Sequence, residues 1–328
     1  MRPLPLFILL LFCTACYAED PWLGQKLMPR QGAKFMNGSR ELPERQFDFP
    51  LVVTDVKGEW LDVGPGYIRK SDTVSLADAA GYYSDYLRMN PGSSWAFNCR
   101  GSVWQAKGKF DNALKDYNEA IRLDSADAAA YNNRGNVRSK KGDLDAALKD
   151  YDEAIRLNPK EAKTYNNRGD VWSDKGDFDA ALKDFTEAIK LDPKHVAAYY
   201  NRGNAWQAKG DFPAALKDYA EAIRLDPKNA DAYNNRSRLL STTPDDRIRD
   251  GKQAVEDAMA ACKLTDWKDP VLLDTLAAAY AEAGDFPKAV EWQAKAVEMA
   301  PAKAKDECRS RLELYRSKKP YREQPQAK

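Results

Sequence analysis

Small and hydrophobic residues return at the same positions every 34 residues through the middle of the chain. Four sets of residues keep this step: Gly101, Gly135, Gly169 and Gly203; Gly108, Gly142, Gly176 and Gly210; Ala113, Ala147, Ala181 and Ala215; and Ala120, Ala154, Ala188 and Ala222. A strict period of this length is typical of helical hairpins stacked into a solenoid. We therefore expect a mainly α fold.

Each period divides into two helices. In the second period the pattern predicts helices over about residues 128–141 and 144–157. Gly142 lies between them, and glycine readily takes the left-handed conformation that ends a helix. Pro159 follows the second helix and prevents its continuation. One hairpin cannot bury its apolar face alone, so we expect consecutive hairpins to stack.

The repeated unit resembles the tetratricopeptide repeat (TPR) family. The matching positions in the second unit are Tyr131, Gly135, Ala147, Tyr151, Ala154 and Pro159. The resemblance implies a right-handed superhelix of helical hairpins over residues 94–303. Its six units are residues 94–127, 128–161, 162–195, 196–229, 230–269 and 270–303. We also expect an N-terminal capping helix at 75–93, a C-terminal capping helix at 304–317 and a mobile tail at 318–328.

The fifth unit departs from the pattern in two ways. Ser237 replaces the repeated glycine, and the turn over residues 241–251 is expanded. Ala254 lies 39 residues after Ala215, five more than the period. The longer turn is either a tolerated surface insertion or a docking loop.

Residues 21–74 have a different character. Turn signals such as Lys57-Gly58 and Gly64-Pro65-Gly66 separate short β-prone runs, which predicts a small barrel. The run 58–63 followed by 66–68 resembles bacterial SH3-like domains. That resemblance implies that Trp60 and Tyr67 could face a ligand such as a cell-wall peptide. The other hypothesis places them in the barrel core, because a small domain needs large apolar side chains for stability.

The N-terminus has the layout of a secretory signal peptide. Arg2 precedes an apolar run over residues 4–12, and small residues and an acid follow. We expect cleavage after Ala18, giving a signal peptide at residues 1–18 and an exported protein, periplasmic or extracellular. The alternative is a lipoprotein anchored at Cys16.

Little in the sequence indicates catalysis or a cofactor. Lys and Arg total 51 and Asp and Glu total 50, so overall charge does not favour nucleic acid as a partner. His195 is the single histidine, expected in an exposed loop, and no phosphate-binding glycine motif is present. The Lys-Asp pairs of the second helices are expected to form a solvated face. We predict a protein that is not an enzyme and needs no cofactor or metal.

Three cysteines follow the predicted signal peptide. They are Cys99, Cys262 and Cys308. Because they are odd in number and widely spaced, we expect buried side chains and no disulfide framework.

Binding is the remaining function, and the TPR resemblance implies that first helices line a concave groove. The positions that this resemblance places in the groove are Asn98, Ser102, Asn132, Asn136, Asn166, Asp170, Tyr200, Asn204, Asn234 and Arg238. Amide groups donate and accept hydrogen bonds, so a row of them can pair with an extended peptide. The chaperone-type carboxylate clamp is not expected, because asparagines occupy slots where that clamp needs Lys or Arg.

Two neighbouring slots have structural interpretations. The slot of Asn133 either borders the groove or bonds to neighbouring helices. Arg134 and its equivalents are expected to form hydrogen bonds or ion pairs between repeats. The predicted function is an exported scaffold that binds a protein or peptide partner. The alternative is an envelope-anchoring protein whose SH3-like domain binds peptidoglycan.

Overall fold

The computed structural model describes residues 24–37, 40–42, 50–64 and 66–323. The predicted signal peptide, its cleavage site and Cys16 lie outside the described residues. The chain forms two compact units, Met1–Val137 and Arg138–Lys328, and each is described by itself.

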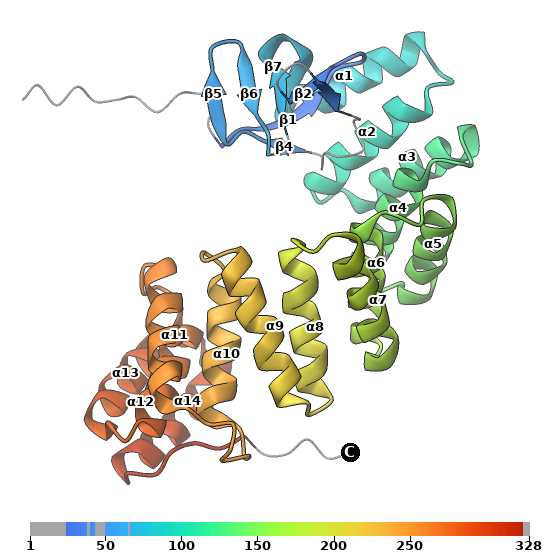
Figure 1. Ribbon diagram of the computed structural model, residues 1–328. Coiled ribbons are helices and arrows are strands. Elements are labelled where there is room, and N and C mark those ends of the chain that lie inside the picture. The colour runs from blue at the N-terminus through green and yellow to red at the C-terminus, as the bar shows by residue number, and fades with distance from the viewer. Residues whose placement is uncertain (1–23, 38–39, 43–49, 65, 324–328) are drawn as a thin grey trace, which may run out of the picture. The chain divides into compact units, whose positions relative to one another are not determined.

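The first unit begins with short antiparallel strands (Figure 1). Their bounds are β1 Lys26–Pro29, β2 Phe35–Asn37, β3 Arg40–Leu42, β4 Leu51–Val52, β5 Asp55–Lys57, β6 Trp60–Asp62, β7 Tyr67–Arg69 and β8 Thr73–Ser75. Within the described residues they form two sheets, with strand orders β4-β1-β8 and β3-β2-β7-β6-β5. A single 3₁₀ turn, η2 (Lys70–Asp72), connects β7 to β8. The predicted β segment therefore precedes the helices.

Strand alternation decides which β side chains enter the core. Leu61 pairs with Ile68 across β6 and β7, and both are fully buried. Trp60 and Tyr67 are the neighbours of these two residues, so they lie on the opposite face of the sheet. Both are half-buried. The hypothesis that they fill the core is wrong.

Helices complete the first unit. They are α1 Leu76–Met89, α2 Ser94–Ala106, α3 Phe110–Leu123 and α4 Ala128–Lys140, with the boundary between the two units inside α4. α1 occupies the position predicted for the N-terminal capping helix. It is tied to β1 by the Tyr83 hydroxyl, which donates to the Pro29 carbonyl at 2.5 Å, and by Met28, which packs in the same core as Ala79.

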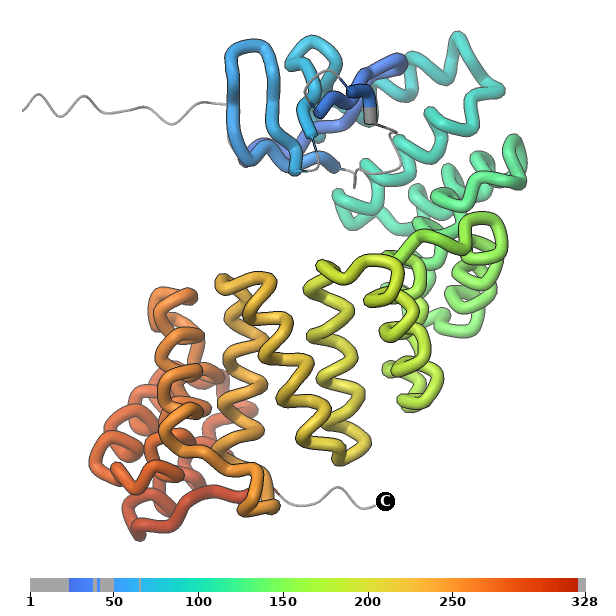
Figure 2. Tube along the Cα trace, in the orientation of Figure 1, coloured from blue at the N-terminus to red at the C-terminus, as the bar shows by residue number. Residues whose placement is uncertain are grey.

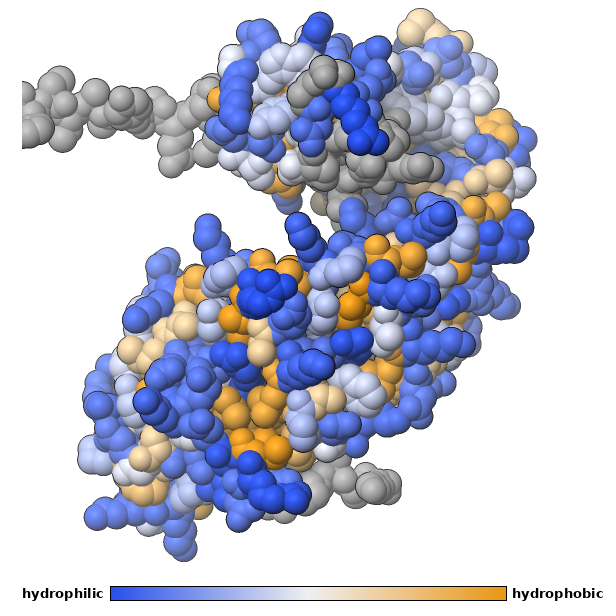
Figure 3. Space-filling view, in the orientation of Figure 1, coloured by the Kyte–Doolittle hydropathy of each residue, from blue (hydrophilic) through white to orange (hydrophobic). Residues whose placement is uncertain are grey.

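The second unit contains the remaining helices. They are α5 Leu144–Leu157, α6 Ala162–Asp174, α7 Phe178–Leu191, α8 Val196–Ala208, α9 Phe212–Leu225, α10 Ala230–Thr242, α11 Gly251–Leu264, α12 Pro270–Glu282, α13 Phe286–Met299 and α14 Ala302–Arg316. From α6 onward, consecutive helices contact one another as a row of hairpins, which the tube trace also shows (Figure 2). The visible face of this unit is mainly hydrophilic, and hydrophobic residues show on it in separate patches (Figure 3).

A Gly-Asp pair forms the turn between the two helices in four hairpins, at Gly142-Asp143, Gly176-Asp177, Gly210-Asp211 and Gly284-Asp285. Gly176 has φ of 80°, which closes α6, and the Asp177 carboxylate then accepts a hydrogen bond from the Ala180 amide at the start of α7. Gly210 and Asp211 act in the same way before α9. The repeated glycine and aspartate therefore set the helix boundaries.

The repeated glycine inside the first helix of a repeat, as at Gly169 and Gly203, makes room for an aromatic ring of the second helix. A Cβ at Gly169 would lie 2.7 Å from the Phe185 ring, and one at Gly203 would lie 2.8 Å from Tyr219. In the fifth unit, Ser237 replaces this glycine and Ala258 stands where the ring would be. The Ser237 hydroxyl instead donates to the Ala254 carbonyl at 2.7 Å. The exchange of glycine for serine is thus matched by loss of the ring.

Parts of the expanded turn and of the tail contact neighbouring helices. Ser241, Thr242 and Thr243 are buried, and the Arg249 guanidinium donates to Glu282 on α12 at 3.0 Å. The tail predicted to be mobile from residue 318 makes such a contact at Glu323, whose backbone amide donates to the Thr242 carbonyl at 2.8 Å.

The described residues contain no candidate for a membrane-spanning helix. No helix there combines sufficient length with sufficient apolarity to cross a bilayer.

The close glycine contact predicts a position-specific effect on stability. Gly169→Ala should lower the free energy of unfolding by about 1–3 kcal/mol, because the added methyl overlaps the Phe185 ring. Gly81→Ala on α1 is the control, since a Cβ there meets nothing within 4 Å and a helical alanine stabilises by about 0.5–1 kcal/mol. Denaturant unfolding of both variants checks this, and equal effects would contradict the packing account.

Candidate peptide-binding site

A buried arginine–aspartate pair joins the two helices of a repeat. The pairs are Arg100–Asp116, Arg168–Asp184, Arg202–Asp218 and Arg236–Asp257. Each is bidentate, with N–O distances between 2.6 and 2.8 Å. The four carboxylates belong to residues that are 2–5% exposed. The expectation that these aspartates form a solvated face is wrong, because each one has an arginine partner inside the repeat.

The same arginines also reach back to the preceding repeat. Arg168 Nη1 contacts Asp152 at 2.7 Å, and Arg202 Nη1 donates to the Thr186 hydroxyl at 3.2 Å. Arg134 donates to Asn118 at 2.8 Å. The predicted link between repeats is confirmed at these positions.

Asparagines form a second set of links along the first helices. Asn201 Nδ2 donates to Asn166 Oδ1 at 3.2 Å and to Asp170 Oδ1 at 2.7 Å. Asn235 Nδ2 donates to the Tyr200 hydroxyl at 3.1 Å and to Asn204 Oδ1 at 3.0 Å. We call these links between consecutive first helices the amide ladder.

The amide ladder also occurs in the compact unit Met1–Val137, where Asn133 Nδ2 donates to Asn98 Oδ1 at 3.1 Å. Of the two interpretations of the Asn133 slot, bonding to a neighbouring helix therefore holds. Asn166 is only 6% exposed, so the expectation that its slot opens into the groove is wrong there.

The other predicted groove residues have varied environments. Ser102 is buried and lies 3.2 Å from the Tyr117 hydroxyl, and Asn204 accepts a further hydrogen bond from Tyr219. Asn132 and Asn136 are half-buried. Six of the ten predicted residues belong to the compact unit Arg138–Lys328.

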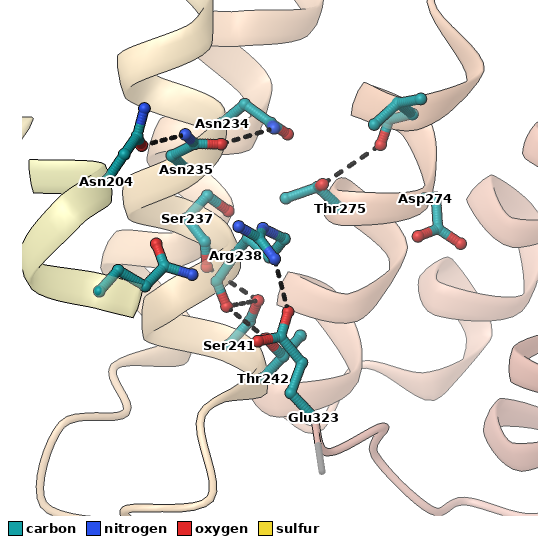
Figure 4. Close-up of polar contacts among 12 residues, drawn as sticks. Asn204, Asn234, Asn235, Ser237, Arg238, Ser241, Thr242, Asp274, Thr275 and Glu323 are labelled. Atoms are coloured by element: carbon teal, nitrogen blue, oxygen red, sulfur yellow. Dashed lines mark hydrogen bonds and ion pairs between the residues drawn. The ribbon is translucent and has the colours of Figure 1, made fainter. Parts of the chain in front are cut away.

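The amide ladder changes at α12. The position that corresponds to Asn235 in the sixth unit is Thr275, whose hydroxyl donates to the Val271 carbonyl within its own helix at 3.2 Å. Asn234 Oδ1 is buried and, within the described chain, has no hydrogen-bond partner (Figure 4). One acceptor of the ladder is thus left open, because the Thr275 hydroxyl donates within its own helix and not to Asn234.

A cavity of about 550 Å³ lies beside this open acceptor. It is lined by residues of α10, α12 and α14 and by the tail, including Asn234, Arg238, Asp274, Arg311 and Tyr321. The sequence indicated the two α10 residues by their repeat positions. It did not indicate those from α14 and the tail, because no repeat covers them.

Asp170 is the acidic member of the groove positions. Burial, with a contribution from Asp174, raises the pKa of its carboxyl group to about 7. Asn136 and Asn204 occupy the same slot in the adjacent units, so a neutral amide is compatible with this position.

A second cavity, of about 520 Å³, lies on the β segment. Trp60, Tyr67 and Met36 contribute to its lining. The Arg69 guanidinium lies 5.1 Å from the Trp60 ring centroid, and Lys57 Nζ donates to the Tyr67 hydroxyl at 2.8 Å. The predicted ligand face is therefore an aromatic surface edged by cations.

The remaining candidate groups have structural surroundings. His195 is half-buried and caps α8, because its Nδ1 accepts from the Ala198 amide at 3.3 Å, so the exposed-loop expectation is wrong. Cys99, Cys262 and Cys308 are buried free thiols, as predicted. The described residues include no group of three or more His, Cys, Asp or Glu side chains that could hold a metal ion.

The raised pKa of Asp170 predicts a pH-dependent effect of one substitution. In the folded chain the carboxyl binds its proton more tightly than in the unfolded chain, so its contribution to stability is full below about pH 4 and is lost as the pH rises through about 7. Asp170→Asn should therefore raise the free energy of unfolding at pH 8 by about 1–3 kcal/mol and change it little at pH 4. Thermal melts of both chains across this range test the prediction, and a pH-independent difference would refute it.

Comparison with known proteins agrees with this geometry. Models of the tetratricopeptide repeat match residues 128–161, 166–230 and 207–242, and a TPR repeat model matches residues 101–142. A search of curated proteins found no match.

Solved structures that are similar to this chain include three that differ in identity, coverage and TM-score. A tetratricopeptide repeat protein from Parabacteroides merdae is 18% identical, with 74% of this chain and 92% of that chain covered and a TM-score of 0.51. The APC/C hetero-tetramer Cut9-Hcn1 is 14% identical, with 73% and 46% covered and a TM-score of 0.61. YrrB, titled a TPR protein with an unusual peptide-binding site, is 22% identical, with 59% and 97% covered and a TM-score of 0.47. This chain therefore contains tetratricopeptide repeats, which the family models match between residues 101 and 242.

Proposed function

We propose that this protein is an adaptor that binds an extended segment of a partner protein on the first-helix face of its repeats. TPR proteins bind protein or peptide partners, and the matched repeats support the same function for this chain. The observation that carries the proposal is the cavity beside α10, where Asn234 Oδ1 has no described partner. A buried acceptor without a donor is costly, so a ligand that supplies a donor gains affinity there.

The amide ladder limits where a peptide can be recognised. Asn201 and Asn235 use their Nδ2 groups to bond to the preceding helix, so these donors are already engaged. At α12 the ladder is interrupted by Thr275. Asn234 and Arg238 are therefore the groove residues best placed to contact a backbone and a charged side chain.

Export is part of the proposal, because the N-terminal sequence has the layout of a signal peptide. The adaptor would then act outside the cytoplasm, with or without a lipid on Cys16. The mass of the N-terminal peptide of the mature protein distinguishes cleavage after Ala18 from lipidation.

The β segment supports a second candidate function, binding of peptidoglycan. Trp60 and Tyr67 lie on the face opposite the core and line the second cavity. Lys34, Lys57 and Arg69 line it too, so a carboxylate-bearing ligand with apolar parts fits its chemistry. Peptide stems of the bacterial cell wall are ligands of this class.

Selection from a random-peptide phage library tests the adaptor function. The unsubstituted chain should enrich a defined set of peptides, and Asn234→Ala combined with Arg238→Ala should weaken their binding by about ten-fold or more. Arg247→Ala is the matched control, because Arg247 is an exposed arginine in the expanded turn and does not line the cavity. Enrichment that survives the double substitution would contradict the proposed site.

Cosedimentation of the full chain with purified cell wall tests the second candidate. Trp60→Ala should reduce the bound fraction by about ten-fold without loss of folding, because the ring lies outside the core. Val52→Ala is the control, since Val52 is exposed and does not line the cavity. Equal retention of both variants would exclude Trp60 as a wall contact.

A further inference from the structure

The chain's own tail makes the contacts of a bound peptide at the end of α10. The Glu323 carboxylate contacts Arg238 Nη1 at 2.8 Å, and the Glu323 amide donates to the Thr242 carbonyl at 2.8 Å (Figure 4). Thr242 is the last residue of α10, and carbonyls at a helix end lack partners within the helix. The tail thus supplies one backbone donor and one carboxylate to the proposed binding surface.

Two preceding residues hold the tail in place. The Arg311 guanidinium lies 4.4 Å from the Tyr321 ring centroid, and Tyr321 packs against the cluster that contains Tyr315. Arg322 forms an ion pair with Glu282 and donates to the Ser241 carbonyl at 3.2 Å. These contacts come from α10, α12 and α14, so the tail is anchored before it reaches Arg238.

The contact at Arg238 is weaker than the anchors. The Arg238 and Glu323 side chains are 40% and 31% exposed, so water and salt screen their ion pair. Within the described chain, Glu323 is the carboxylate that pairs with Arg238. Removing the Glu323 side chain would leave the Arg238 guanidinium at the edge of the cavity without this carboxylate partner.

The tail is also an incomplete ligand for this surface. The tail gives Arg238 a carboxylate partner and gives the Thr242 carbonyl a hydrogen-bond donor. Asn234 Oδ1 still lacks a described partner. A separate peptide that follows α10 further can offer a backbone amide to this oxygen as well as a carboxylate to Arg238. Such a peptide makes more hydrogen bonds than the tail makes.

We propose that the surface at the end of α10, which includes Asn234, Arg238 and the Thr242 carbonyl, is a site for an extended acidic peptide. Residues 321–323 of the same chain occupy this surface until such a peptide displaces Glu323. This inference rests on the proposed adaptor function, because it names the ligand class and the regulation of the same cavity. The tail competes effectively although its last contact is weak. It is tethered seven residues beyond the end of α14, and short tethers give effective concentrations of about 1 mM.

Fluorescence anisotropy with a labelled synthetic peptide tests the inference. The probe is the acetylated pentapeptide Tyr-Arg-Glu-Gln-Pro, which repeats the sequence of residues 321–325. Glu323→Gln in the full chain should bind it about five-fold tighter than the unsubstituted chain, because the competing ion pair is lost. A chain that ends at Pro320 should bind it about ten-fold tighter.

Two controls separate competition from general loosening. Glu313→Gln removes an exposed glutamate that pairs with Arg316 on α14, and it should bind like the unsubstituted chain. Arg238→Ala combined with Glu323→Gln should lose the gain. Equal binding by the Glu323→Gln chain and the unsubstituted chain overturns the inference, as does a gain that survives Arg238→Ala. Thermal melts confirm that each variant is folded, and the Glu323→Gln result stands if the shortened chain is not.

Regulation by the tail and the adaptor function itself can be tested separately. Peptides selected by phage display that bind the Glu323→Gln chain and the unsubstituted chain equally would leave the adaptor function standing and overturn regulation by the tail. Failure of every chain to select a peptide would overturn both.

Discussion

The helical part of this protein depends on arginine–aspartate pairs that are buried inside four of its repeats. Arg202 illustrates the arrangement, because its guanidinium holds Asp218 of its own repeat in a bidentate pair and also contacts Thr186 of the preceding repeat. Removing one partner of such a pair leaves an unpaired buried charge, which typically costs about 3–5 kcal/mol. One side chain therefore fixes both the angle within a hairpin and the spacing between hairpins. Apolar residues of the same size would pack as well but would not fix the register so specifically.

This constraint also determines which polar groups are free for binding. The arginines hold consecutive first helices at a distance where asparagines can bond from one to the next, so most groove amides serve the architecture. The amide ladder changes in the sixth repeat, since Thr275 stands in the asparagine position and its hydroxyl donates within α12. The open acceptor of Asn234 and the guanidinium of Arg238 therefore both lie on α10, beside the cavity and the chain's own tail. In a solenoid each repeat contacts only its neighbours, so one imperfect unit can carry a site without disturbing the rest.

The sequence predicted most of the helical fold, because glycine, alanine and aromatic positions recur at a strict spacing. α5 begins and ends at the predicted residues, and the arginine links between repeats were expected. The burial of Asp184 was missed, because a Lys-Asp pair considered alone is typical of a solvated helix face. The face of Trp60 was open to prediction, since it alternates with Leu61, but the apolar content of a small domain favoured the core. The path of the tail could not be predicted, because its contacts with α10 lie 81–85 residues away in sequence and follow no period.

A double-mutant cycle on Arg202 and Asp218 tests the central claim that buried pairs hold the repeats together. The free energy of unfolding would be measured for Arg202→Leu, Asp218→Leu and the double variant, with Arg224 and Glu221 on the exposed face of α9 as the reference pair. The account predicts that each single substitution at the buried pair costs about 3–5 kcal/mol and that the double variant recovers a large part of that loss. The exposed pair should show little coupling. Additive losses at Arg202 and Asp218, or equal coupling in the two pairs, would contradict the account.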